Sequence, residues 1–504
     1  MKKLFFSIQG TVFANIADLA KENALLGSEV VIIKCNESIC HCWGNMECNK
    51  GICSICKMQV NRFVKQMPPS VRIINIDDYS DDTKEKEILS ITFDYKSVED
   101  IKNIEYDGVN IGYGCLSNYV SFTRNLNPLI DNEFREYFDS FLRKTSYLVC
   151  CQKEILRRES PDHIYFFNGR FSNVRPLVEM AKSMNIEYTC TEGKYFYEGK
   201  IFQNNFENSM PHSIEYNTRL MENAWNDVSV SQSEKEWLGK HFYKSKIDGN
   251  YTGDTNYTAG QAKGQLPEGW DNTKRNYVIF NSSEDEFFSI GDEYDKKKVF
   301  NTQVEGISFI AESLQNRDDV HLYLRIHPNL KNIKYRYHLD LLELGTKYKN
   351  LTVIPGNSPI SSYSLIGVAD RIIVFGSTIG AESSYLGKAV INLAGAPYSG
   401  LDITYTPKTP EDLLPLLQAE ILENNANKKH LLMYGYYYVY TKRPRTVFFS
   451  HDLKPIRFLA KKVFVLESDK LFGSNILFLI YQKFVKTLGR KKNIPIKEDS
   501  VHLA

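Results

Sequence analysis

Short apolar runs alternate with amphipathic stretches at the start of the chain. Residues 3–9 and 29–34 are apolar runs of strand length, and residues 12–26 between them carry apolar side chains at helical spacing. A Gly-Ser pair at 27–28 ends the helix before the second strand. A strand, a helix and a strand in this order predict the beginning of a doubly wound α/β domain.

The same alternation returns in the second half of the chain. Residues 277–280, 320–326 and 371–375 are predicted to be buried strands. The last of them is followed by a tight turn of small residues, a short helix and a further strand at 388–393. We therefore predict a second doubly wound domain, so that the fold class is α/β with two Rossmann-like domains.

The division between the domains is predicted from composition. Residues 248–274 are rich in Gly, Asn, Thr and Asp and lack periodicity, which is typical of a linker. The expected division is an N-terminal domain at 1–247, a linker at 248–275, a C-terminal domain at 276–450 and a helical tail at 451–504. Within the tail, 474–492 is apolar with a basic end, which fits either an anionic membrane surface or a terminal core helix.

Composition narrows the classes of function. The chain has 504 residues and a formal net charge of +1, whereas a nucleic-acid binder should carry a basic excess. No apolar run reaches the length of a membrane span, and the first residues do not form a signal peptide. We therefore expect a cytoplasmic protein whose ten cysteines are not a disulfide framework.

Six of the ten cysteines fall within 35–56, directly after the predicted strand at 29–34. Their spacing includes C-x6-C-x10-C-x2-C, and four soft ligands with one short C-x2-C step suit tetrahedral zinc or an iron–sulfur cluster. The predicted metal ligands are Cys35, Cys42, Cys53 and Cys56, with Cys40, His41 and Cys48 as spares. Such a closed site would be structural. The alternative is a loop of free thiols or a transient redox pair.

A turn of small residues follows the predicted strand at 371–375. It reads Gly-Ser-Thr-Ile-Gly at 376–380 and leads directly into the short helix. The hydroxyl groups of Ser377 and Thr378 and the N–H groups of the turn could bind a phosphate at the helix N-terminus. Glu382, in the first helical turn, could accept sugar hydroxyls. The alternatives are a turn without a ligand and a Glu382 that only complements the helix dipole.

The predicted strand at 320–326 ends in a histidine. Pro328 follows His327, and a proline cannot continue a central strand, so the imidazole is expected at the carboxyl end of the strand. Ligands of open α/β sheets bind at this edge, where an imidazole could donate to a phosphate oxygen. The alternative is a histidine that makes only a structural hydrogen bond.

A further polar turn, at 281–286, follows the predicted strand at 277–280. It reads Asn-Ser-Ser-Glu-Asp-Glu, and Ser282 or Ser283 would cap the next helix. Because the turn is expected at the same sheet edge, Ser283 is also a candidate ligand contact.

These features resemble a known family. A strand that ends in His-Pro, followed by Ser-Thr-x-Gly-x-Glu and then GKAVINLAGAPYSG, resembles the capsule polysaccharide biosynthesis and export family, which includes bacterial Kdo transferases of the GT-B type. The resemblance is best over 276–405. It implies a GT-B-like fold, in which two Rossmann-like domains face a cleft and the second binds a nucleotide-sugar donor. The donor-binding residues that the resemblance implies are His327, Ser377, Thr378 and Glu382. The predicted donor-binding set also includes Ser283 from the polar turn, together with Pro328 and Gly380.

The identity of the donor stays open in this comparison. More distantly, the His-Pro motif and the later Ser-Thr pair are similar to the His-Pro and Ser-Ser pairing on the CMP-binding face of bacterial sialyltransferases, which makes a CMP-sugar one candidate. The segment 396–402 lacks the aromatic residue that usually follows the glycine in Kdo transferases, so the donor sugar is not implied.

A second set of polar residues lies in the N-terminal half. An Asn-Gly-Arg turn at 168–170 follows a predicted strand at 163–167, and the strand predicted at 186–189 brings Glu192 to the same edge. This pattern resembles the N-terminal half of polysaccharide glycosyltransferases of the same family. The implied acceptor-binding residues are Asn168, Gly169, Arg170 and Arg175. Arg175 also stands one helical turn from Glu179, where a surface ion pair is the favoured interpretation.

An inverting sugar transfer needs a base near the acceptor hydroxyl. Glu192 is the candidate general base, and His212 is its rival. No catalytic metal is expected, because helix dipoles and side chains can neutralise the leaving diphosphate.

We therefore expect a glycosyltransferase that acts in capsule or lipopolysaccharide biosynthesis. Its partners would be a nucleotide-sugar donor and a growing surface polysaccharide or glycolipid acceptor, with no nucleic acid. Its location would be the cytoplasm, with peripheral contact at the inner face of the membrane. The alternatives are a nucleotide-sugar epimerase-type enzyme and a non-catalytic export or assembly subunit of the same fold.

Overall fold

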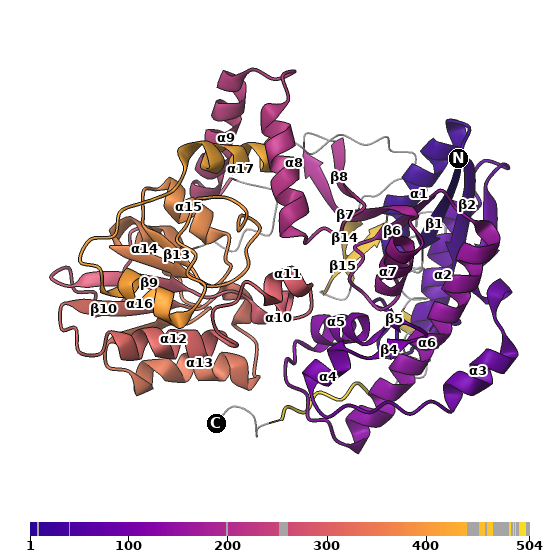
Figure 1. Ribbon diagram of the computed structural model, residues 1–504, viewed down its shortest axis with the longest axis horizontal. Helices are drawn as coiled ribbons and strands as arrows, with labels where there is room; N and C mark the ends of the chain where they lie inside the picture. The colour runs from indigo at the N-terminus through magenta and orange to yellow at the C-terminus, as the bar shows by residue number, and fades with distance from the viewer. Residues whose placement is uncertain are drawn as a thin grey trace. The chain divides into compact units, whose positions relative to one another are not determined.

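The structure is a computed structural model that describes residues 1–7, 10–39, 41–197, 200–250, 261–440, 453–458, 461–466, 483–484, 487, 489 and 493–499. The chain forms two compact units, whose elements are labelled in Figure 1. Unit 1 consists of Met1–Pro211 and Pro444–Ala504, and unit 2 consists of His212–Arg443.

Unit 1 is built on a six-stranded sheet. Its strands are β1 (Lys2–Ser7), β2 (Glu29–Lys34), β3 (Arg72–Asn75), β6 (His163–Phe167), β7 (Glu187–Tyr197) and β8 (Lys200–Glu207). Their order is β3-β2-β1-β6-β7-β8, and all neighbours are parallel except β7 and β8. The strand order reverses between β1 and β6, and such a switch point is where doubly wound sheets bind ligands.

Both faces of this sheet are covered. Helices α1 and α2 pack on the face that carries Phe5, Val30 and Ile32. Leu4 and Val31, which alternate with them and point to the opposite face, are also fully buried. The helices of unit 1 are α1 (Gly10–Leu25), α2 (Lys50–Val64), η1 (Ile76–Tyr79), α3 (Asp82–Leu89), α4 (Val98–Lys102), α5 (Gly112–Thr123), α6 (Asn132–Glu159) and α7 (Arg175–Ser183).

Unit 2 is built on a five-stranded parallel sheet. Its strands are β9 (Arg275–Phe280), β10 (Val320–Arg325), β11 (Leu351–Ile354), β12 (Arg371–Val374) and β13 (Val390–Asn392). Their order is β11-β10-β9-β12-β13, so the switch point lies between β9 and β12. Helices α14 and α15 lie on one side of this sheet and α12 and α13 on the other (Figure 1). The prediction of two doubly wound sheets is confirmed.

The helices of unit 2 are α8 (Ile214–Asn226), α9 (Gln232–Ile247), α10 (Glu284–Phe287), α11 (Asp292–Asp295), α12 (Gln303–Ser313), η2 (Pro328–Leu330), α13 (Arg336–Lys347), α14 (Ser362–Val368), α15 (Ile379–Tyr385), α16 (Pro410–Gln418) and α17 (Lys428–Tyr440).

Two antiparallel strand pairs of unit 1 are separate from the main sheets. They are β4 (Glu105–Tyr106) with β5 (Val109–Asn110), and β14 (Leu453–Phe458) with β15 (Lys461–Leu466).

The boundary between the units differs from the expected end of the N-terminal domain at 247. Helices α8 and α9 belong to unit 2, because they pack against α17 there. Two glycines let α9 and α17 approach closely: a Cβ on Gly239 would lie 2.5 Å from the Leu432 carbonyl oxygen, and one on Gly435 would lie 2.6 Å from the Gly239 carbonyl oxygen. Helical periodicity indicates such helices but does not identify the partner of their apolar faces.

The expected linker at 248–275 also belongs to unit 2 where it is described. Trp270 stacks on Tyr323 of β10, with ring centroids 4.3 Å apart, and Leu266 packs against the same core cluster. Residues 251–260 lie outside the described residues. The expected helical tail contains the strands β14 and β15, and most of 474–492 lies outside the described residues.

The strand predicted at 186–189 is longer than expected. β7 continues to Tyr197 and turns back as the antiparallel strand β8, because the sequence keeps supplying β-branched and aromatic residues. The parallel pairing with β6 ends where Phe167 lies opposite Thr191. Glu192 therefore still lies directly beyond the carboxyl end of β6, as the sequence predicts.

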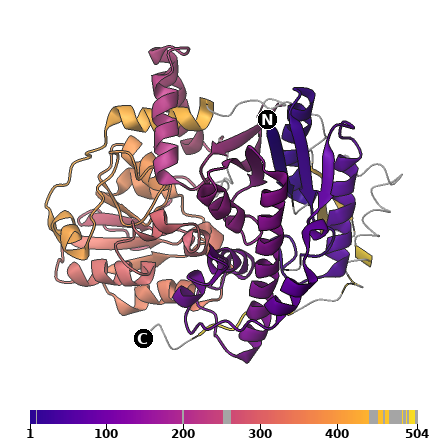
Figure 2. The same ribbon diagram turned by 45° about the vertical axis from the view of Figure 1, so that its right-hand side comes forward.

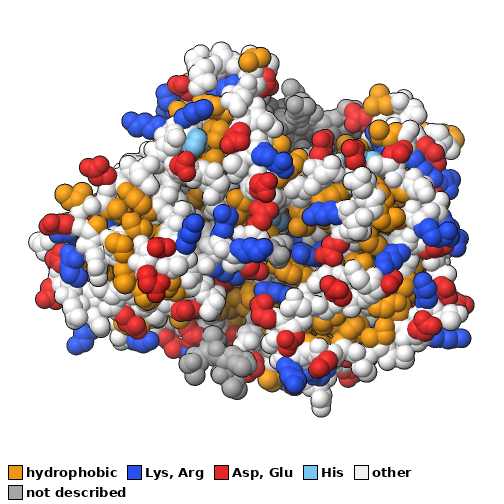
Figure 3. All heavy atoms as spheres, in the orientation of Figure 1, with side chains coloured by type: hydrophobic (Ala, Val, Ile, Leu, Met, Phe, Trp, Pro, Cys, Tyr) orange, Lys and Arg blue, Asp and Glu red, His pale blue; other side chains and the backbone are white. Residues whose placement is uncertain are grey.

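The surface carries both signs of charge. Figure 3 shows acidic and basic side chains interspersed on the face that it draws, in keeping with the net charge of +1. Within the described part of the chain, no helix combines the length and the apolar character that crossing a membrane requires.

Candidate functional site

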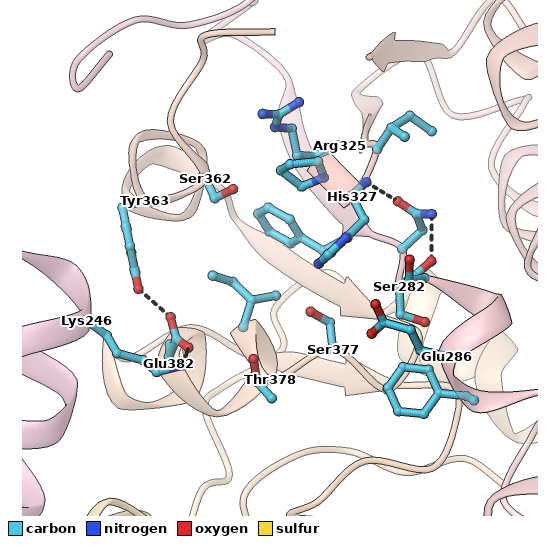
Figure 4. A pocket seen from close by; sticks show the side chains of 18 of the residues that line it. Lys246, Ser282, Glu286, Arg325, His327, Ser362, Tyr363, Ser377, Thr378 and Glu382 are labelled. Atoms are coloured by element: carbon cyan, nitrogen blue, oxygen red, sulfur yellow. Dashed lines mark hydrogen bonds and ion pairs between the residues drawn. The ribbon is translucent and has the colours of Figure 1, made fainter. Parts of the chain in front are cut away.

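A cavity of about 420 Å³ lies at the carboxyl edge of the sheet in unit 2. The turns that follow β9, β10 and β12 line it, which places it at the switch point of the sheet. Six residues predicted to bind the donor are among its lining residues: Ser283, His327, Pro328, Ser377, Thr378 and Glu382. Figure 4 shows Lys246, Tyr363 and Glu382 at one end of the cavity and Ser282 and Glu286 at the other.

His327 is held by hydrogen bonds on both its backbone and its ring. Its N–H donates to Asn281 Oδ1 at 2.8 Å, and its Nδ1 accepts from the Asn329 N–H at 3.2 Å. Because Nδ1 is the acceptor, the neutral imidazole carries its proton on Nε2. The ring points into the cavity, toward Ser377 (Figure 4). An Nε2–H is therefore the group that this ring can offer to an anionic ligand.

Asn329 joins the turn after β10 to the turn after β9. Its Nδ2 donates to Ser283 Oγ at 3.1 Å and to Glu286 Oε1 at 2.6 Å. Ser282 is fixed from behind, since its N–H donates to Gln303 Oε1 at 3.1 Å. These bonds order the two turns without a ligand, which lowers the entropic cost of binding one.

The turn after β12 depends on glycine. Gly376 has a φ of 75°, and a Cβ at this position would lie 2.4 Å from the Gly395 carbonyl oxygen. Its N–H donates to Asn392 Oδ1 at 3.0 Å, and the Tyr398 hydroxyl donates to the Ser377 carbonyl at 2.7 Å. Helix α15 has only seven residues. A bound phosphate would therefore depend more on hydroxyl groups and His327 than on the helix dipole.

Gly380 lies against Tyr398 behind this turn. A Cβ at Gly380 would lie 2.2 Å from the buried Tyr398 hydroxyl oxygen, so Gly380→Ala should break the bond to Ser377 and shift the turn. We expect a loss of about 1–3 kcal/mol in the free energy of unfolding, the usual cost of overpacking. Chemical denaturation measures it. The control is Gly367→Ala in α14, where a Cβ meets nothing within 4 Å, and an equal loss there would contradict the prediction.

Glu382 is engaged by two residues distant in sequence. Lys246 Nζ lies 3.2 Å from its Oε1, and the Tyr363 hydroxyl donates to its Oε2 at 2.5 Å. Burial and then the charge of Glu382 raise the pKa of Tyr363 well above its ordinary value, so the phenol remains a donor. The sequence predicts that Glu382 either accepts hydrogen bonds from sugar hydroxyls or only complements the helix dipole. The structure adds an ion pair with α9 and a hydrogen bond with α14.

Arg325 supports one wall of the cavity. Its side chain is 1% exposed, and its guanidinium donates to the carbonyl oxygens of Pro355 and Ser358 at 2.5 and 3.0 Å. Burial lowers the pKa of Arg325 to about 10, which leaves it charged at neutral pH. These bonds fix the loop before α14, and α14 supplies Tyr363 to the cavity.

Glu284 begins α10, beside a small cavity of about 30 Å³. Burial raises the pKa of Glu284 to about 7, against the lowering effects of Lys298 and the Gln303 N–H. Because the folded-state pKa lies above the unfolded value, ionisation opposes folding, and stability should fall as pH rises from about 4.5 through 7. Glu284→Gln should therefore raise the melting temperature at pH 8 and leave it nearly unchanged at pH 4.5. A lower melting temperature at pH 8 would contradict this.

The predicted acceptor residues of unit 1 gather after β6. Asn168 and Gly169 both have positive φ, at 62° and 85°. The Asn168 side chain donates through Nδ2 to Glu192 Oε2, and its Oδ1 accepts from the Arg170 N–H at 3.3 Å. Arg170 Nη2 donates to Ser121 Oγ at 3.1 Å. An amide, a carboxylate and a guanidinium therefore stand together at this edge, in a backbone conformation typical of functional turns.

Arg175 and His212 have other surroundings in the chain. The Arg175 guanidinium lies over the Tyr113 ring, 3.9 Å from its centroid, and 3.6 Å from Glu179. The predicted pair with Glu179 is therefore present, and Glu179 also accepts from the Asn110 N–H at 3.0 Å. His212 is the first residue of unit 2.

The cysteine-rich loop follows β2 and leads into α2. Burial raises the pKa of Cys42, and the thiols of Cys56, Cys35 and Cys53 raise it further. Among the described residues, no three His, Cys, Asp or Glu side chains are arranged to hold a metal. Cys48 departs from the expectation of reduced thiols, because it is disulfide-bonded.

Some residues and hydrogen bonds of the cavity could not be predicted from the sequence. Asn281 and Glu286 belong to the polar turn that the pattern singled out, but their hydrogen bonds to the turn after β10 were not predicted. Lys246 and Tyr363 carry no local signal, because they lie 136 and 19 residues from their partner Glu382.

Comparisons with known proteins leave the family of the chain open. No protein-family model matches it, and no curated protein matches it. Among solved structures it is similar to two structures of Thermosulfurimonas dismutans KpsC. One is a β-Kdo 2,4 transferase, at 18% identity and a TM-score of 0.34, covering 55% of this chain and 80% of that chain. The other is a β-Kdo 2,7 transferase, at 12% identity and a TM-score of 0.33, covering 65% and 89%.

The chain is also similar to an epimerase. The UDP-GlcNAc 2-epimerase of Neisseria meningitidis bound to UDP-GlcNAc matches at 10% identity and a TM-score of 0.25, covering 82% of this chain and 90% of that chain. The fold assignment rests on the strand orders of the two sheets.

Proposed function

We propose that the chain is a glycosyltransferase that moves a sugar from a nucleotide-sugar donor to a saccharide or glycolipid acceptor. The observation that carries the proposal is the cavity of about 420 Å³ at the switch point of unit 2, where His327, Ser377 and Thr378 converge. Two Rossmann-like units in one chain are also the composition of a GT-B enzyme, as the sequence resemblance implies.

In this proposal, unit 2 holds the donor. The Nε2–H of His327 and the hydroxyls of Ser377 and Thr378 bind the phosphate oxygens of the nucleotide. The same donors stabilise the charge that develops when the bond between the sugar and the phosphate breaks. No catalytic metal is needed for this step. A CMP-sugar is the candidate donor that the resemblance favours.

Unit 1 holds the acceptor in the same proposal. Glu192 takes the proton of the acceptor hydroxyl while that oxygen attacks the anomeric carbon, and the nucleotide phosphate leaves. Asn168 donates to the Glu192 carboxylate and so orients it. Arg170 and Gly169 complete this edge, and His212 is the rival base. The product would belong to a bacterial surface polysaccharide or glycolipid, made in the cytoplasm or at the inner face of the membrane.

Product analysis tests the proposal. The purified chain is incubated with each of a panel of nucleotide sugars, alone and with a mixture of oligosaccharide and lipid-linked acceptors, and the products are separated by mass. A glycosyltransferase should release the nucleotide and extend an acceptor only when both are present. An epimerised donor in the absence of acceptor would instead favour an epimerase-type enzyme. No reaction, with a polysaccharide transporter captured from bacterial membranes, would favour an assembly subunit.

We also propose a structural zinc ion or iron–sulfur cluster at Cys35, Cys42, Cys53 and Cys56. Asn45 supports this proposal, because its Nδ2 donates to Cys53 Sγ at 3.1 Å and its N–H to the Cys42 carbonyl at 2.8 Å, so that one residue bonds to both cysteines. The four sulfurs would have to draw together around the metal.

Elemental analysis of protein purified without added metal should find about one zinc ion, or the iron of one cluster, per chain. Cys53→Ser should abolish that content, whereas Cys115→Ser, at a buried cysteine outside the loop, should not. Absence of both metals, with thiols in the loop that react as freely as in the unfolded chain, would contradict the proposal.

A further inference from the structure

The cysteine-rich loop carries an aromatic side chain to the carboxyl edge of the sheet in unit 1. Trp43 stacks on Phe171, with ring centroids 5.1 Å apart and planes at 29°, and lies 6.2 Å from Phe167. These two phenylalanines flank the turn at 168–170. The indole is neither buried nor fully exposed. It therefore lies beside the amide, carboxylate and guanidinium groups of the predicted acceptor edge.

Arg170 contacts the same phenylalanine. Its guanidinium lies 4.8 Å from the centroid of the Phe171 ring, and Asn168, two residues earlier, donates to Glu192. Phe171 is thus a shared support for the indole of Trp43 and the guanidinium of Arg170. Phe171 and the turn at 168–170 therefore connect the flat Trp43 indole with three polar groups, which are the Asn168 amide, the Arg170 guanidinium and the Glu192 carboxylate.

The position of Trp43 is fixed through buried contacts of the loop. Asn118, which is fully buried, donates to the His41 carbonyl at 3.4 Å and to Ser172 Oγ at 3.0 Å, and accepts from the Ser172 N–H at 3.1 Å. It therefore ties the residues just before Trp43 to the residue just after Phe171. On its other side, the loop is held by Tyr137, whose hydroxyl donates to the Met46 carbonyl at 3.0 Å.

We propose that Trp43 forms, with Asn168, Arg170 and Glu192, a saccharide-binding subsite of unit 1. The flat indole packs against the apolar C–H face of a pyranose ring, and the neighbouring polar groups bond its hydroxyls. A saccharide is favoured over a nucleotide because the Glu192 carboxylate, which accepts a hydrogen bond from Asn168 in the turn between the two phenylalanines, would repel a phosphate. The loop between β2 and α2 then has a role in recognition: it presents Trp43. This inference rests on the proposed function only in assigning the saccharide as the acceptor.

A glycan array, printed with bacterial and synthetic oligosaccharides and probed with the full-length chain, tests the subsite. Calorimetry then measures the affinity of the glycan that is retained best. Trp43→Ala should weaken that affinity at least about fivefold, and Trp43→Phe, which keeps a ring, should weaken it less. Trp237→Ala, at a 62% exposed tryptophan of unit 2, is the matched control and should not change it.

A measurement on the unaltered chain guards against misfolding of the variants. The bound glycan should protect Trp43, and not Trp237, from oxidation by N-bromosuccinimide, as read by peptide mass spectrometry. Equal affinity of wild type and Trp43→Ala, equal oxidation of Trp43 with and without glycan, or no glycan retained by the wild type would overturn the proposal.

The outcomes separate this inference from the proposed function. If the chain binds a glycan through Trp43 but binds no nucleotide sugar, the saccharide-binding subsite is supported and the proposed glycosyltransferase function is contradicted. If the chain transfers sugar from a nucleotide sugar to an acceptor, and Trp43→Ala leaves the affinity for that acceptor unchanged, the glycosyltransferase function is supported and the subsite is contradicted.

Discussion

Glu192→Gln is expected to lower the turnover of sugar transfer by roughly 10²–10⁴-fold, the range for loss of a general base. Glutamine keeps the shape of the side chain and can still accept the hydrogen bond from Asn168, but it cannot take a proton. Donor affinity should hardly change, because Glu192 belongs to unit 1 and the donor cavity to unit 2. Steady-state kinetics with the acceptor identified by product analysis provides the measurement.

The matched control for this variant is Glu187→Gln. Glu187 lies on the same strand, is 67% exposed and lies 3.5 Å from His163. It should retain wild-type turnover. Near-wild-type turnover of Glu192→Gln would show that Glu192 is not the general base. Loss of turnover in His212→Ala would then identify His212 as the base. A collapse of donor affinity in Glu192→Gln would instead contradict the assignment of donor and acceptor to separate units.

His327→Ala is expected to weaken donor binding by about 10–150-fold. This corresponds to roughly 1.5–3 kcal/mol, the usual contribution of a hydrogen bond to a charged group. The fold should persist, because the neighbouring turn is also held by Asn329 through Ser283 and Glu286. Calorimetric titration of the wild type and the variant with the nucleotide sugar measures the difference.

A control for this prediction lies on the same strand. His321, at the opposite end of β10, bonds Thr352 Oγ1 at 2.9 Å and is not among the residues that line the cavity. His321→Ala should keep wild-type donor affinity. Unchanged affinity in a folded His327→Ala variant would rule out the phosphate contact.

Much of the fold could be predicted from periodicity. Strands buried on both faces read as continuous apolar runs, so the segments that became β1, β2, β9, β10 and β12 were recognisable. The turns that line the cavity were recognisable too, because Pro328 and Gly376 follow the ends of strands.

Partners distant in sequence could not be predicted. The apolar faces of α8 and α9 do not reveal that these helices pack on α17 of unit 2. The sequence therefore predicts that the N-terminal domain ends at 247, whereas the first segment of unit 1 ends at Pro211. The same limit concealed the bonds of Glu382 to Lys246 and Tyr363, and the stacking of Trp43 on Phe171. In each case the sequence indicates a side chain able to make the contact, and only the tertiary fold selects its partner.

Binding of a nucleotide sugar in the cavity of unit 2 is what the proposed function requires first, and a thermal-shift panel of nucleotides and nucleotide sugars measures it. A ligand that binds only the folded chain raises its melting temperature by mass action. We expect at least one nucleotide class to raise the melting temperature of the wild type, and the double variant Ser377→Ala with Thr378→Ala to lose that rise while its own melting temperature without ligand stays close to the wild type. A panel in which no nucleotide shifts the wild type, or in which the double variant shifts equally, would contradict the account.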